Sequence, residues 1–114
     1  MTIDVRKKGK VQIVDFSGTM TIGTTDVALR EKFKELIDGG NRLFIFNLQG
    51  VSYMDSAGLG ETAACCLRAA EADGMIKLVV ATGGKVEQIL QITKLDRAFE
   101  VFSDEEEALA SFIR

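Results

Sequence analysis

Two compact apolar runs constrain the fold of this chain more than any other feature of its sequence. Residues 43–48 read Leu-Phe-Ile-Phe-Asn-Leu, and residues 75–81 form a second run of similar character. Short runs that are rich in β-formers and bounded by turn residues are typical of strands buried on both faces. Such strands occur in parallel sheets that are covered by helices, so the sequence predicts an α/β protein.

Segments with helical periodicity alternate with these strands. A helix is predicted from Asp26 to the Gly39-Gly40 pair, and another follows Asp55 and ends at Gly74. A short helix follows residues 82–84, and a final helix begins with a capping box from Ser103 to Glu106. The residues expected on the inner faces of the four helices are Leu29, Phe33, Leu36 and Ile37; Leu59, Ala63, Cys66, Leu67 and Ala70; Val86, Ile89 and Leu90; and Leu109, Phe112 and Ile113.

The N-terminal segment predicts a hairpin. Short β-rich runs at residues 3–5 and 11–16 flank the turn Lys8-Gly9-Lys10, and residues 17–25 are expected to form a loop. With a last strand at residues 99–102, the predicted order is β-β-α-β-α-β-α-β-α. Residues 1–114 are thus expected to form one α/β domain with about four helices. Its sheet is mainly parallel, with right-handed crossovers and one antiparallel strand at an edge.

Composition excludes several classes of function. The chain has 114 residues, a net charge of −3 and no histidine, so serine–histidine and cysteine–histidine catalysis are excluded. Its two cysteines, Cys65 and Cys66, are adjacent and lack metal-site or redox spacing, so we expect buried reduced thiols. We expect no enzyme activity, cofactor, metal, nucleic-acid partner or membrane insertion. The absence of a signal peptide after Met1 favours a cytoplasmic location.

The segment from Val51 to Gly60 has the most functional information. It joins a buried strand to a helix, at the edge where parallel α/β sheets build binding surfaces. Asp55 and Ser56 are both suitable N-caps, and a helix start tolerates an added phosphate. Gly58 and Gly60 carry no side chain, so we expect a partner's backbone to approach closely there. On physical grounds alone, a plain cap with packing glycines is the favoured interpretation.

The run Gly50-Val51-Ser52-Tyr53-Met54-Asp55-Ser56-Ala57-Gly58-Leu59-Gly60 resembles the signature of STAS domains, particularly bacterial anti-sigma-factor antagonists. The resemblance extends over the whole chain and implies partner switching. The antagonist binds an anti-sigma factor that is a serine/threonine kinase, is phosphorylated and released, and is reset by a phosphatase. A monomer or weak dimer is expected. The implied partner surface includes the loop at residues 20–25, and its residues are Met20, Thr21, Met54, Asp55, Ser56, Ala57, Gly58, Leu59 and Gly60.

The resemblance also implies a phosphoacceptor within the motif. Sporulation-type antagonists carry the acceptor hydroxyl two residues after the aspartate, where this chain has Ala57. Stressosome-type relatives carry it directly after the aspartate, so Ser56 is the candidate and Ser52 a weaker one. The sequence leaves open a constitutive, never phosphorylated antagonist. It also leaves open a STAS subunit of a transport or lipid-trafficking complex, and a module that senses a small molecule or nucleotide.

Overall fold

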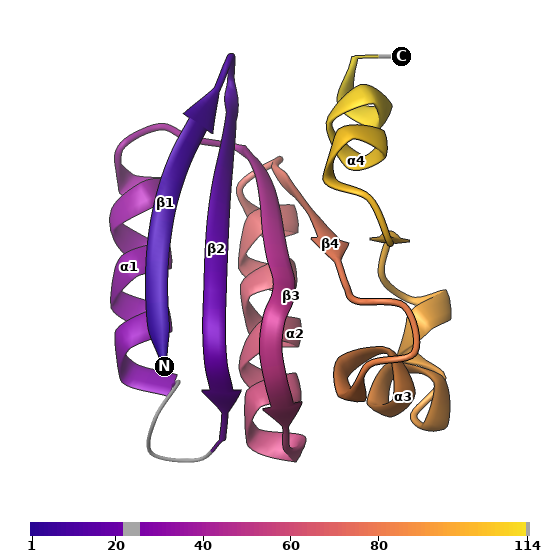
Figure 1. Ribbon diagram of the computed structural model, residues 1–114. Helices are drawn as coiled ribbons and strands as arrows, with labels where there is room; N and C mark the ends of the chain where they lie inside the picture. Colours follow the sequence, from indigo (N-terminus) through magenta and orange to yellow (C-terminus); the bar gives the residue numbers. More distant parts are fainter. Residues whose placement is uncertain (22–25, 114) are drawn as a thin grey trace.

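The structure is a computed structural model that describes residues 1–21 and 26–113. Its elements, in chain order, are β1 (Thr2–Lys8), β2 (Val11–Met20), α1 (Asp26–Asp38), β3 (Leu43–Met54), α2 (Ser56–Glu71), β4 (Met75–Val79), α3 (Lys85–Ile92), the 3-10 turn η1 (Leu95–Arg97), β5 (Val101–Phe102) and α4 (Glu105–Phe112). The strands form one sheet in the order β1-β2-β3-β4-β5. β1 is antiparallel to β2 and the remaining pairs are parallel, which confirms the predicted fold (Figure 1).

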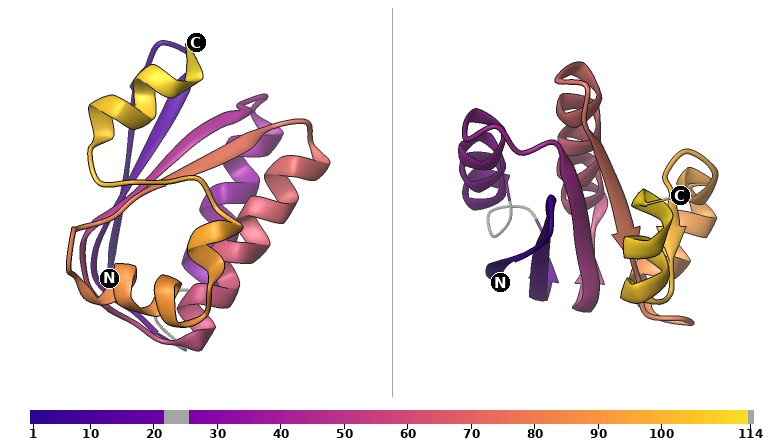
Figure 2. Two further views of the ribbon diagram at one scale, coloured as in Figure 1. Left: turned by 90° about the vertical axis from the view of Figure 1, so that its right-hand side faces the viewer. Right: turned by 90° about the horizontal axis from the view of Figure 1, so that it is seen from above.

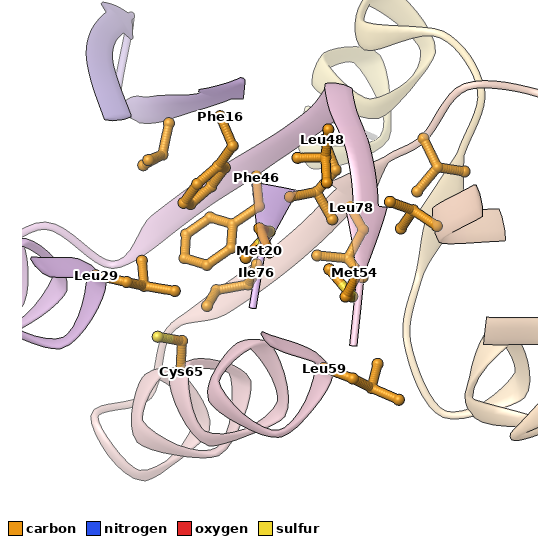
Figure 3. Close-up of a cluster of buried hydrophobic side chains, with 14 of the residues drawn as sticks. Phe16, Met20, Leu29, Phe46, Leu48, Met54, Leu59, Cys65, Ile76 and Leu78 are labelled. Atoms are coloured by element: carbon orange, nitrogen blue, oxygen red, sulfur yellow. The ribbon is translucent and has the colours of Figure 1, made fainter. Parts of the chain in front are cut away.

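The two faces of the sheet are covered by different helices. Successive residues of a strand point to opposite faces, so each strand contributes to both. One face packs against α1 and α2, and α4 lies on the other (Figure 2). The first face holds the larger core, which is centred on Phe33, Phe44 and Phe46. The ring centre of Phe33 lies 4.9 Å from that of Phe44 and 5.8 Å from that of Phe46. Figure 3 shows part of this core.

Polar contacts attach α4 to the second face. Glu105 accepts a hydrogen bond of 2.6 Å from Nη2 of Arg6, which lies on β1. Lys77 is buried on β4, where its Nζ donates to Oγ of Ser111 at 2.5 Å and lies 4.2 Å from the ring centre of Phe112.

None of the helices in the part of the chain that the structure describes has both the length and the hydrophobicity that a membrane span needs.

Two strands extend beyond their predicted ends. β2 continues to Met20 and β3 to Met54, whereas the sequence predicted a loop from residue 17 and a strand ending at residue 48. The extensions pair with each other across two register shifts. Gly50 permits this pairing, since a Cβ there would lie 2.7 Å from the carbonyl oxygen of Phe16. The polar and glycine residues of both extensions are mostly exposed, and this hid the strands from a search for apolar runs.

The helix starts and faces differ in two places from the prediction. Asp104, not Ser103, is the N-cap of α4, and its carboxylate accepts from the backbone N–H of Glu106 at 3.1 Å. Of the residues predicted on the inner face of α2, Leu59 is buried and Cys66 packs against the core. Leu67, which is 62% exposed, and Ala70, which is also exposed, were predicted wrongly. The residues of α2 that are buried are Gly58, Leu59, Glu61, Thr62, Cys65 and Ala69.

The buried face of α2 differs from the predicted one for a physical reason. Small residues on the buried face allow the helix to lie close to the sheet, and the polar residues on that face have partners within the protein. The Thr62 hydroxyl donates to the carbonyl oxygen of Gly58 at 2.9 Å. Cys65 is buried and Cys66 half-buried, both as free thiols, and burial raises their pKa values to about 12 and about 11.

Candidate functional site

The functional motif forms the corner between β3 and α2. Asp55 is the N-cap of α2, and its Oδ1 accepts a hydrogen bond of 2.9 Å from the backbone N–H of Gly58. Its own N–H donates to the carbonyl oxygen of Met20 at 3.1 Å, so the corner is tied to the end of β2. Ser56 is the first residue of the helix. The expectation that Asp55 caps the helix is therefore confirmed, and the expectation that Ser56 does so is wrong.

Gly58 has an intramolecular role. A Cβ at this residue would lie 2.2 Å from the carbonyl oxygen of Met20, which is far inside van der Waals contact. Gly58 is also buried, so the backbone that approaches it closely belongs to β2 of the same chain. The close approach of backbone that the sequence predicts at Gly58 is therefore made by the chain's own β2, and the prediction that Gly58 leaves this space for a partner is wrong. Gly60 differs, because it is exposed and a Cβ there would meet nothing within 4 Å.

The predicted partner-binding residues divide into two groups. Met20, Met54, Gly58 and Leu59 are buried, and Figure 3 shows the three side chains among them within the core. They support the corner from inside and present little or no surface in this conformation. The members with exposed or partly exposed surface are Thr21, Asp55, Ser56, Ala57 and Gly60. Residues 22–25 of the neighbouring predicted loop lie outside the described residues.

Ser56 is the accessible hydroxyl at this corner. It is exposed, and its hydroxyl forms no hydrogen bond with any residue that the structure describes. Asp55 occupies the N–H of Gly58, and the carbonyl oxygen of Asp55 accepts from the N–H of Leu59 at 3.0 Å. The backbone N–H groups of Ser56 and Ala57 therefore remain at the positive end of α2, where they favour an added negative charge.

The weaker candidate, Ser52, is placed differently. It lies within β3, and its hydroxyl donates to the carbonyl oxygen of Gly18 at 3.2 Å. That contact spans the β2 and β3 extensions, so the hydroxyl already has a structural role. Ser56 is thus the freer of the two serines.

Sequence reasoning missed a charged cluster between α1 and α2. Glu61 is 8% exposed, and its two carboxylate oxygens accept hydrogen bonds of 3.1 and 3.3 Å from Arg30 on α1. Nη1 of Arg68 lies 3.9 Å from the same carboxylate. Glu61 and Arg68 are seven residues apart, about two turns of one helix, so they lie on the same face, and this spacing was the available signal. The cluster fixes α1 against the helix that carries Ser56.

The described part of the chain has no group of three or more Cys, Asp or Glu residues arranged to hold a metal ion. The site consists of the exposed Ser56 at the polar corner where β3 meets α2.

The family model for the STAS domain matches residues 2–108, so the chain belongs to the STAS domain family. An anti-sigma factor antagonist from Mycobacterium paratuberculosis has a similar structure, with 23% identity, a TM-score of 0.86, and coverage of 96% of this chain and 92% of that one. A Thermotoga maritima protein proposed to be an anti-sigma factor antagonist matches at 21% identity, a TM-score of 0.89, and coverage of 98% and 95%. SpoIIAA, a Bacillus cell fate determinant solved in its phosphorylated form, matches at 20% identity, a TM-score of 0.68, and coverage of 99% and 100%.

Proposed function

We propose that this chain is an anti-sigma-factor antagonist that acts by partner switching. In this proposal it binds an anti-sigma factor of the serine/threonine-kinase type, is released by phosphorylation of Ser56, and is reset by a phosphatase. The observation that carries the proposal is the exposed, unengaged hydroxyl of Ser56 at the start of α2 in a STAS domain. Similarity to anti-sigma factor antagonists, one of them in a phosphorylated form, supports it.

The proposed modification is a phosphoryl transfer to Ser56. The serine oxygen forms a bond to the γ-phosphorus of ATP bound in the kinase, and the bond from that phosphorus to the bridging β–γ oxygen breaks. ADP leaves, and the hydroxyl proton passes to a base of the kinase. This chain contributes only the nucleophile and its position, so we propose no catalytic activity of its own.

Release follows from charge and bulk at the corner. A phosphate adds about −1.5 to −2 charges and three acceptor oxygens. The free N–H groups of the first turn of α2 can accommodate that charge, so the domain stays folded. The carboxylate of Asp55 repels the phosphate, which must then lie outward over Ala57 and Gly60. A partner that packs closely against these small residues is displaced.

The test uses a purified partner kinase, ATP and mass-spectrometric mapping of the phosphorylated residues. We expect phosphate on Ser56, with Ser56→Ala binding the kinase but resisting release, and Ser56→Asp binding it more weakly. Ser52→Ala is the matched control, because it removes a hydroxyl of the same motif. Phosphate only at another residue, or none with a kinase shown to be active on a second substrate, contradicts the proposal.

A further inference from the structure

Two adjoining hollows lie at the end of the sheet opposite Ser56, around the turn between β1 and β2 at the top of Figure 1. The first has a volume of about 520 Å³ and lies between this turn and α4. It is mostly apolar, and its apolar lining residues are Val11, Leu43, Leu109, Ala110, Phe112 and Ile113. Lys8 and Glu106 also border it and form an ion pair, with Nζ of Lys8 3.7 Å from Oε1 of Glu106. Its volume is within the usual range for small-molecule sites, about 300–1,000 Å³.

The second hollow, of about 420 Å³, is basic. Lys7, Lys10 and Arg42 line it and no acidic residue does. Gly9, Lys10 and Leu43 border both hollows, so the two hollows meet over the end of the sheet. Lys7 and Lys8 are successive residues of β1 and point to opposite faces, so Lys7 lies in the basic hollow and Lys8 in the apolar one. A cationic surface next to an apolar groove has the polarity that an amphipathic anion requires.

The cations of the second hollow are available to a ligand. Lys7 and Lys10 form no ion pair with any residue between 1 and 21 or between 26 and 113. Arg42 donates to the carbonyl oxygens of Ile37 and Asn41, at 3.0 and 2.7 Å, which holds its guanidinium at the rim without neutralising it. These three positive charges gather in a chain whose net charge is −3, so they are a local concentration and not a general property of the surface.

We propose that these two hollows form one binding site for the carboxylate form of a medium-chain fatty acid that is free in solution. Its carboxylate lies against Lys7 and Lys10, and its hydrocarbon tail lies in the groove beneath α4. A single fatty acid fits this site better than a bilayer surface does, because most of the apolar lining residues face into the hollow rather than outward. Among these lining residues, Ile113 is 86% exposed and extends from the surface. The site is separate from Ser56 and does not depend on the function proposed for it.

Isothermal titration calorimetry with octanoate, decanoate and dodecanoate, each below its micelle concentration, tests the proposal. We expect saturable binding that tightens by up to about fourfold for each methylene group that enters the groove. Amide chemical shifts should change around Lys8–Val11 and residues 109–113 and stay unchanged around Ser56. The absence of saturable binding, or affinity independent of chain length, overturns the proposal.

Two controls separate the site from other anion-binding surfaces. Equal affinity for inorganic phosphate overturns the proposal, because it reduces the site to a basic patch. Binding to phosphatidylglycerol vesicles without binding to monomeric decanoate also overturns it, because the surface is then a membrane contact.

Variants test both halves of the site. The double substitution Lys7→Gln and Lys10→Gln should weaken decanoate binding by about tenfold. The matched control, Lys85→Gln with Lys94→Gln, removes the same charge from exposed lysines outside both hollows and should leave binding unchanged. Ala110→Trp should block the groove, and Ile113→Asn, at an exposed position that folding tolerates, should weaken binding of dodecanoate more than of octanoate. The assignment is overturned if the three variants within the hollows bind these fatty acids as tightly as the control variant does.

Discussion

Replacing Gly58 with alanine adds one methyl group at the contact between α2 and the end of β2. The new carbon would lie 2.2 Å from the carbonyl oxygen of Met20, and an ordinary contact begins at 3.4 Å, so the atoms must separate by more than 1 Å. The obstructing atom is backbone and is hydrogen-bonded to Asp55, so it cannot rotate away. Overpacking costs about 1–3 kcal/mol, and a forced shift of backbone by more than 1 Å belongs in the upper part of that range, at about 2–3 kcal/mol. The better helix propensity of alanine returns about 1 kcal/mol. We therefore expect a net loss of about 1–2 kcal/mol.

Urea denaturation measures this change in the free energy of unfolding. Gly60→Ala is the matched control, because Gly60 is in the same helix but has open space where its Cβ would be. That variant should gain up to about 1 kcal/mol from helix propensity. The reasoning fails if Gly58→Ala is as stable as the wild type, or if the two variants change stability in the same direction.

Three further changes test the rest of the structure. Burial raises the pKa of Glu105, but the hydrogen bonds from Arg6 and Asn47 and the positive charges of Arg6 and Lys8 together outweigh burial, so the pKa is lowered. The stability that this carboxylate contributes is present above its ordinary pKa and is lost as the pH falls through the lowered value. Glu105→Gln should therefore destabilise the protein at neutral pH, and in urea titrations the difference from the wild type should shrink as the pH falls below the ordinary pKa of a glutamate. Glu61→Ala should cost about 1.5–3 kcal/mol in the same assay, with Glu71→Ala, exposed on the same helix, close to neutral. Leu67→Gln should change stability by less than about 0.5 kcal/mol, and a larger loss would mean that this side chain is covered in solution.

The sheet and its helices could be predicted because their signals are local. Leu29 and Phe33 are both buried, with 1% of each residue exposed, as the periodicity of the first helix indicated. The inner face of α2 could not be predicted by hydropathy, because the helix buries Glu61 and Thr62 and exposes Leu67. Whether a polar side chain is buried depends on a partner elsewhere in the chain, such as Arg30 for Glu61.

In the candidate site too, features that depend on neighbouring residues could be predicted, and features that depend on distant residues could not. The position of Asp55 as a cap and the location of the motif at a strand-to-helix corner follow from residues adjacent in sequence. The role of Gly58 does not, since the Met20 carbonyl that it meets is 38 residues away in the chain. A glycine needed for a contact within the fold and a glycine needed for a partner look alike in sequence.

The order of the strands in the sheet, β1-β2-β3-β4-β5, is also their order along the chain, and this affects how the protein can be assembled. Each strand emerging during synthesis finds its neighbour already made, so the sheet can grow by addition at one edge without inserting a strand between two others. Such sequential pairing keeps loop closures short. α4 arrives last, and until then the apolar surface of Val11, Ile13 and Ile45 has no helix over it. Nascent chains lacking the final ten residues should therefore be the species that aggregates and that chaperones retain.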